Sequence, residues 1–86
     1  MKTYIVSTVG LYGHWGRGSS LFSAAQNCKK QGGKNKDIVS MSVILNDPDA
    51  FIDDFGAICY GGVGKQNADC INVGYSTLAG LLKPKV

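Results

Sequence analysis

The side chains that could carry out chemistry are few. One histidine, His14, and three cysteines, Cys28, Cys59 and Cys70, match in number the four ligands of a tetrahedral zinc site. No two of them have the close spacing that holds a pair of ligands locally, so buried thiols are the expected state. With no glutamate and no second histidine, acid–base catalysis would fall to Asp, Lys, Tyr or His14. We therefore expect a protein that is not an enzyme and has no metal or cofactor.

Two glycine-rich stretches resemble phosphate-binding loops in part. In the run 61–65, the phosphate-loop pattern requires a glycine where Cys59 stands and a Ser or Thr where Gln66 stands, so the pattern fails twice. The run 16–20 precedes a predicted helix, whose first N–H groups favour an anion. The alternative is a turn that uses the flexibility of glycine.

Aromatic and arginine side chains are concentrated in the glycine-rich segment 10–18. Tyr12, Trp15 and Arg17 are residue types that anchor protein interfaces and also stack on nucleic-acid bases. The alternative is that Trp15 folds back onto the core while Arg17 is solvated. We expect a loop here that contacts a partner.

Charge is separated along the chain. The formal net charge is +3, and the sequence pI of about 8.8 lies just below the values typical of nucleic-acid modules. A basic cluster is followed by an acidic one, which suits a protein partner of mixed charge or RNA; the alternative is two solvated faces. The clusters are Lys29, Lys30, Lys34 and Lys36, then Asp47, Asp49, Asp53 and Asp54.

Cysteine count and hydropathy indicate the compartment. Three cysteines are an odd number, whereas secreted disulfide scaffolds more often have four or six. The first nine residues lack a convincing signal peptide, and no apolar stretch reaches the length of a membrane span. We expect a cytoplasmic protein of the host cell with reduced thiols and no membrane partner, although Cys59 and Cys70 could face each other across strands.

Hydrophobic periodicity predicts the elements that must position these side chains. Residues 3–9 and 38–45 alternate as strands rich in β-branched residues. A helix is expected to begin at Ser19 or Ser20 and to end at Gly32-Gly33. Asp47 and Pro48 predict a short second helix through Phe55, with Phe51 in the core. Residues 57–60 and 70–75 are expected to form a hairpin, and residues 77–82 a helical turn or a strand end.

These elements predict one α+β domain spanning 1–86. We expect a mostly antiparallel four-stranded sheet, with one main helix packed on one face and a short second helix.

The block from the first strand through Trp15-Gly16-Arg17-Gly18 into the segment 20–27 resembles small proteins of phages and mobile elements. In size and plan the chain is similar to anti-CRISPR proteins. This resemblance implies a non-enzymatic inhibitor that docks on a CRISPR–Cas effector complex and blocks target DNA binding. The positive charge departs from the acidic DNA mimics of that group, so DNA mimicry is not expected.

Two functions follow as expectations. The first is an inhibitory binding protein, a monomer or a homodimer through a sheet edge, with a CRISPR–Cas effector complex as partner. The alternative is a small nucleic-acid-binding module that places its lysine cluster on phosphates. An enzyme is the third hypothesis and has the least support from the residues. The candidate contacts are Tyr12, Trp15, Arg17, Lys29, Lys30, Lys34, Lys36, Asp47, Asp49, Asp53 and Asp54.

Overall fold

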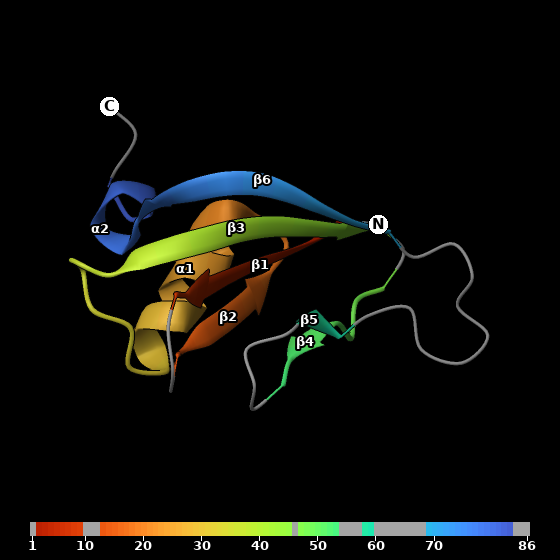
Figure 1. Cartoon of the computed structure of the whole chain (residues 1–86), viewed down its shortest axis with the longest axis horizontal. Coiled ribbons are helices and arrows are strands. Elements are labelled where there is room, and N and C mark those ends of the chain that lie inside the picture. The colour runs from red at the N-terminus through yellow and green to blue at the C-terminus, as the bar shows by residue number, and fades with distance from the viewer. Residues whose placement is uncertain (1, 10–12, 46, 54–57, 60–68, 84–86) are drawn as a thin grey trace.

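The computed structural model describes residues 2–9, 13–45, 47–53, 58–59 and 69–83. Six strands and two helices are present within these residues (Figure 1). In chain order they are β1 (Lys2–Thr8), β2 (Trp15–Gly18), α1 (Leu21–Lys30), β3 (Ile38–Leu45), β4 (Phe51–Ile52), β5 (Ile58–Cys59), β6 (Asp69–Thr77) and α2 (Leu78–Leu81).

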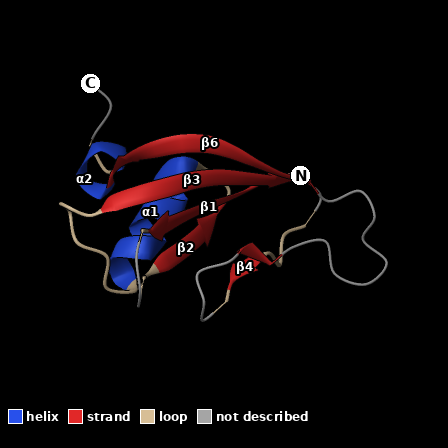
Figure 2. Cartoon of the chain, viewed as in Figure 1, coloured by secondary structure: helices blue, strands red, loops and turns tan. Residues whose placement is uncertain are grey.

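Four strands form an antiparallel sheet in the order β2-β1-β3-β6. Helix α1 lies on one face and packs mainly against β2 and β1, and the short α2 adjoins α1 and β6 (Figure 2). Strands β4 and β5 pair with each other in a separate ribbon. The fold is thus the α+β sheet with one main and one short helix that the sequence predicts.

Both faces of the sheet bury side chains. On the α1 face, Val6 and Val39 pack with Ala24, Cys28 and Leu78. A second, smaller core lies on the opposite face. It consists of Ile5, Ile44 and Ala50, with Trp15, Ile52, Ile58 and Cys70 packed against it.

The ends of α1 lie where the sequence predicts. The Ser20 hydroxyl accepts a hydrogen bond from the Ser23 amide at 3.1 Å, which satisfies one of the amides left unpaired at the helix start. At the other end Gly32 has a φ of +117°, a conformation that favours glycine, and its N–H donates to the Lys29 carbonyl at 3.1 Å.

The expectation of a loop through residues 10–18 is wrong at its C-terminal end, because residues 15–18 form β2. Gly16 and Gly18 face α1, opposite Val6 and Tyr4 of β1. A Cβ on Gly16 would lie 2.2 Å from the Ala24 carbonyl oxygen, and one on Gly18 would lie 2.7 Å from the Ser23 Cβ. These glycines therefore let the helix backbone approach the strand directly.

The expected second helix after Pro48 is also wrong. Asp47 accepts a hydrogen bond from the Asp49 amide at 3.0 Å, which forms a turn rather than a helix cap. Phe51 and Ile52 then form β4, paired with Cys59 and Ile58 of β5. Phe51 is 46% exposed instead of lying in the core. A short apolar run fits a strand as well as a helix, so pairing with β5 decides the outcome.

The hairpin expected between 57–60 and 70–75 does not form, because β5 pairs with β4 while β6 pairs with β3. The β3–β6 register runs from Leu45 opposite Asp69 to Ile38 opposite Thr77, which gives β6 more partners than the two-residue β5 offers. Residues 77–82 take the helical alternative as α2.

We predict that Gly16→Ala unfolds at a much lower urea concentration than the unchanged protein. The added methyl group meets helix backbone, which cannot move aside as a flexible side chain does. A loss of about 3 kcal/mol in the free energy of unfolding is expected.

Gly74→Ala is the matched control for this variant. Gly74 has a φ of +136° but only the Met41 methyl group, at 3.6 Å, near its Cβ position. The expected cost is therefore backbone strain alone, on the order of 1 kcal/mol. Equal losses in the two variants would contradict the close packing of α1 on β2.

Candidate binding surface

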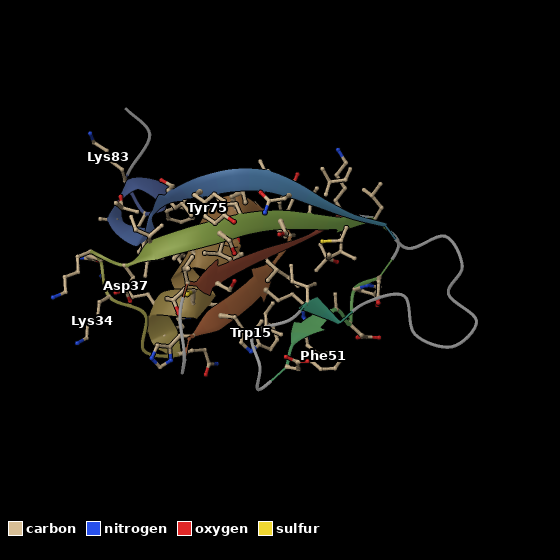
Figure 3. The ribbon with its side chains drawn as sticks, in the orientation of Figure 1. Trp15, Lys34, Asp37, Phe51, Tyr75 and Lys83 are labelled. Carbon is tan, nitrogen blue, oxygen red and sulfur yellow. The ribbon has the colours of Figure 1, made fainter. Side chains whose placement is uncertain are left out.

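Five exposed lysines gather at one end of the molecule, which we call the basic end. They come from the last turn of α1, from the segment that follows it, and from the residue after the C-cap of α2. Figure 3 shows Lys34 and Lys83 at this end together with Asp37. The five residues are Lys29, Lys30, Lys34, Lys36 and Lys83.

Backbone hydrogen bonds fix the segments that carry these lysines. The Asp37 carboxylate accepts from the Lys34 amide at 2.8 Å, and the Asp37 amide donates to the Lys34 carbonyl at 2.9 Å. Helix α2 is tied to the same segment, because the Leu78 amide donates to the Asp37 carbonyl at 2.9 Å and the Ala79 amide to the Asn35 carbonyl at 3.0 Å. The backbone of this end is therefore organised before any partner binds.

The charge balance at this end is strongly positive. Asp37 is the one acidic residue in the segments that carry the five lysines. Lys2, the remaining described lysine, lies at the far end of the sheet, where it pairs with Leu45. Lys29 and Lys30 also offset the partial negative charge of the last carbonyls of α1. Among the described residues, the basic end is thus a concentrated positive surface.

His14 belongs to this surface, which the sequence did not indicate. Its ring lies against Gly32, where a Cβ would be 2.8 Å from the imidazole Cε1. Together they line a polar hollow of about 260 Å³ that also includes Lys34, Lys36 and Asp37. His14 lies near these lysines because the pairing of β1 with β2 brings residue 14 to the end of α1. No local sequence pattern indicates this long-range contact.

An apolar groove of about 790 Å³ adjoins the basic end. Its walls come from the start of α1, from β1 and from α2, and Lys83 lies among its lining residues. Phe22 in this groove is 45% exposed. The other apolar side chains of the groove are Tyr4, Leu21 and Leu81. Sequence reasoning missed the groove because its walls are distant in the chain.

Trp15 and Arg17 already have contacts inside the protein. The Arg17 Nη1 donates to the Ala50 carbonyl at 2.8 Å, and the guanidinium carbon lies 6.0 Å from the centre of the Trp15 ring. Trp15 packs against the core formed by Ile5, Ile44 and Ala50. Both residues therefore attach the segment before β4 to the sheet, and their role as partner contacts stays a prediction. Tyr12 lies outside the described residues.

The acidic cluster does not form one exposed surface. Asp47 is only 3% exposed and accepts the Asp49 amide, so its carboxylate is enclosed by the protein. Asp49 is exposed and Asp53 half-buried. They follow β3 on the side of β4, away from the basic end (Figure 1). Asp54 lies outside the described residues.

Cys28 and Cys70 are free thiols. Burial raises the pKa of Cys28 above its ordinary value of 9.0, and the nearby Asp37 carboxylate raises it further. Burial also raises the pKa of Cys70, against a smaller lowering by a hydrogen bond with Ser42. A raised pKa keeps a thiol protonated and unreactive at neutral pH. The side chain of Cys59 lies outside the described residues.

Two kinds of site are not found in the described part of the chain. No group of three or more His, Cys, Asp or Glu side chains there is placed to hold a metal ion. Among the same residues, no helix is long and apolar enough to cross a membrane.

Comparison with known proteins identifies no relative. No family model, curated protein sequence or solved structure matches the chain.

We predict that the protein loses stability as the pH rises through about 9.0 and above. The unfolded Cys28 thiol ionises there while the folded thiol remains protonated, so ionisation favours the unfolded state. Urea unfolding at pH 7.5 and pH 10 in reductant measures this loss. Cys28→Ala should show a smaller loss between the two pH values, and an equal loss would show that other groups cause it.

Proposed function

We propose that this chain is a small non-enzymatic binding protein that inhibits a larger complex by occupying part of its surface, with the basic end as the contact. The observation that carries this proposal is the placement of five exposed lysines from three separate segments on one fixed end. Ammonium groups that extend from an ordered backbone at one end of the protein favour an anionic partner surface.

The apolar groove favours a protein component in that partner. Non-specific binding to nucleic acid comes mainly from cationic side chains on phosphates, whereas the centre of a protein interface buries apolar and aromatic side chains. Phe22 and Leu81 beside Lys83 offer both kinds of contact on one continuous surface. A protein surface with acidic residues around an apolar anchor fits this arrangement best.

The resemblance to anti-CRISPR proteins makes a CRISPR–Cas effector complex the first partner to test. Such a complex holds its guide–target duplex in a positively charged channel, which a basic protein would not enter as a mimic of DNA. The basic end would instead contact an acidic protein surface or the guide RNA. Docking there would block target DNA binding by exclusion.

A nucleic-acid-binding module is the second candidate, favoured by the same lysine cluster. The two candidates differ in salt dependence and in the use of the groove. For duplex DNA, each phosphate contact adds about 0.9 to the slope of log affinity against log salt.

We predict that Lys34→Gln weakens partner binding, while Lys2→Gln leaves it unchanged. The two variants remove the same charge from exposed positions at opposite ends of the sheet. Fluorescence anisotropy with labelled protein measures the affinity for the effector complex and for duplex DNA and RNA. Equal affinities for Lys34→Gln and Lys2→Gln would exclude the basic end as the contact.

We predict that Phe22→Ser weakens binding to the effector complex by about 30-fold, the effect of a hot-spot residue worth about 2 kcal/mol. Phe51→Ser is the control, since Phe51 is 46% exposed and Phe22 45%, but only Phe22 lines the groove. If the chain binds only nucleic acid, with a steep salt slope and no effect of Phe22→Ser, the second candidate is correct.

A further inference from the structure

The polar hollow beside His14 brings together side chains from two separate parts of the chain. His14 precedes β2, whereas Lys34 and Lys36 lie between α1 and β3, and all three line the hollow of about 260 Å³. Gly32 lines it as well, and both His14 ring nitrogens lie 3.1 Å from the position that a Cβ on Gly32 would take. The polar edge of the imidazole is therefore at the wall of the hollow.

The side chains of the hollow have hydrogen-bond donors that the protein does not use. His14 and Lys34 are engaged through their backbone: the His14 amide donates to the Thr8 hydroxyl at 2.6 Å, and the Lys34 amide donates to the Asp37 carboxylate at 2.8 Å. Within the described part of the chain, no hydrogen bond or ion pair engages the His14 imidazole or the ammonium groups of Lys34 and Lys36. A neutral imidazole has one N–H donor and each ammonium has three. Three donor groups are therefore available to a ligand.

Hydrogen bonds fix the backbone around the hollow. The Thr8 amide donates to the His14 carbonyl at 2.8 Å, and the Val9 amide to the Ile38 carbonyl at 3.1 Å. At the end of α1, Gly32 has the φ of +117° that favours glycine, and this leaves room for the His14 ring. Because the walls are ordered, a ligand has to immobilise only the side chains that contact it.

Charge and size point to a small anion with several oxygens. Two lysines outnumber Asp37, the one acidic residue that lines the hollow, and the Asp37 carboxylate already accepts the Lys34 amide. A phosphate monoester carries a charge of about −1.5 to −2 at pH 7 and three acceptor oxygens, which match the three donor groups. A carboxylate or a phosphodiester carries less charge and fewer free oxygens. Pockets for drug-sized molecules start at roughly 300 Å³, so the hollow fits a single group of this kind rather than a large cofactor.

We propose that the polar hollow is a binding site for a phosphate dianion, either free phosphate or the monoester of a phosphorylated side chain. The ammonium groups of Lys34 and Lys36 and the His14 imidazole donate to its oxygens. This site goes beyond the proposed function, because phosphate can occupy it with no partner protein present. A chain that binds no phosphate can still use the basic end for a partner, so either proposal can fail while the other stands.

An NMR titration of the ¹⁵N-labelled full chain with inorganic phosphate tests the site, with sodium chloride adjusted to hold the ionic strength constant. We expect saturating shifts of the amide signals of Gly13, His14, Gly32 and Lys34, and no shift in β4. Acetylated and amidated phosphoserine is the second probe. Tighter binding of phosphoserine assigns the site to a phosphorylated side chain, and equal or weaker binding assigns it to free phosphate. Dimethyl phosphate, a diester, should bind several-fold more weakly than either.

Two substitutions separate the hollow from the rest of the basic end. Lys36→Gln should raise the dissociation constant for phosphate about fivefold, the effect of one exposed charge pair. Lys29→Gln is the matched control, because Lys29 is also exposed at the basic end but does not line the hollow. Asp37→Asn should tighten binding about threefold, since it removes a like charge while the amide oxygen can still accept the Lys34 amide. The amide spectrum itself shows whether each variant is folded.

Three results would each overturn the phosphate site. The first is a set of phosphate-induced shifts spread evenly over Lys29, Lys30 and Lys83 as well as the hollow, which indicates a diffuse ion atmosphere. The second is equal binding of dimethyl phosphate and inorganic phosphate, because the hollow then does not distinguish a dianion. The third is an equal loss of phosphate affinity in Lys29→Gln and Lys36→Gln.

Discussion

The approach of α1 to β2 is the constraint on which the rest of the structure depends. The helix backbone lies where the side chains of residues 16 and 18 would be, so only glycine at both positions permits the contact. That contact brings Ala24, Ala25 and Cys28 onto Val6 and so forms the larger core. It also turns Trp15 and Arg17 to the opposite face, where they attach the segment before β4. One pair of glycines thus organises both sides of the sheet.

The shape of the candidate binding surface also depends on the contact between α1 and β2. With α1 held against β2, its last turn delivers Lys29 and Lys30 to the end of the sheet where the 31–37 segment begins. Hydrogen bonds from α2 to Asn35 and Asp37 then place Lys83 and the apolar groove beside them. The packing of two helices adds Lys83 to the lysines of residues 29–36, so that charge from separate parts of the chain lies on one surface.

Sequence reasoning succeeded where local chemistry decides the structure. The run 38–45 is a strand because it is rich in β-branched residues and its apolar side chains alternate with Ser40 and Ser42. Helix α1 begins after its capping serine and ends before its glycines. Sequence reasoning failed where a contact between residues distant in the chain decides the local structure. Trp15–Gly18 contains two glycines and therefore resembles a loop, but those glycines serve the helix that packs on them. The lysines of 29–36 were recognisable as a cluster, whereas His14, Lys83 and the groove join it only in the folded chain.

The ordered backbone beneath the flexible lysine side chains has a consequence for the selectivity of the candidate binding surface between partners. Their backbone is held by internal hydrogen bonds, so binding has to order only the side chains, at about 0.5–1.5 kcal/mol for each one immobilised. A lysine carries its charge on a long flexible stem and does not require a partner group in one fixed orientation. The planar guanidinium of arginine does favour such an orientation. A surface built this way follows the density of negative charge opposite it and tolerates irregular outlines. Discrimination between partners must therefore come from the rigid apolar walls beside it.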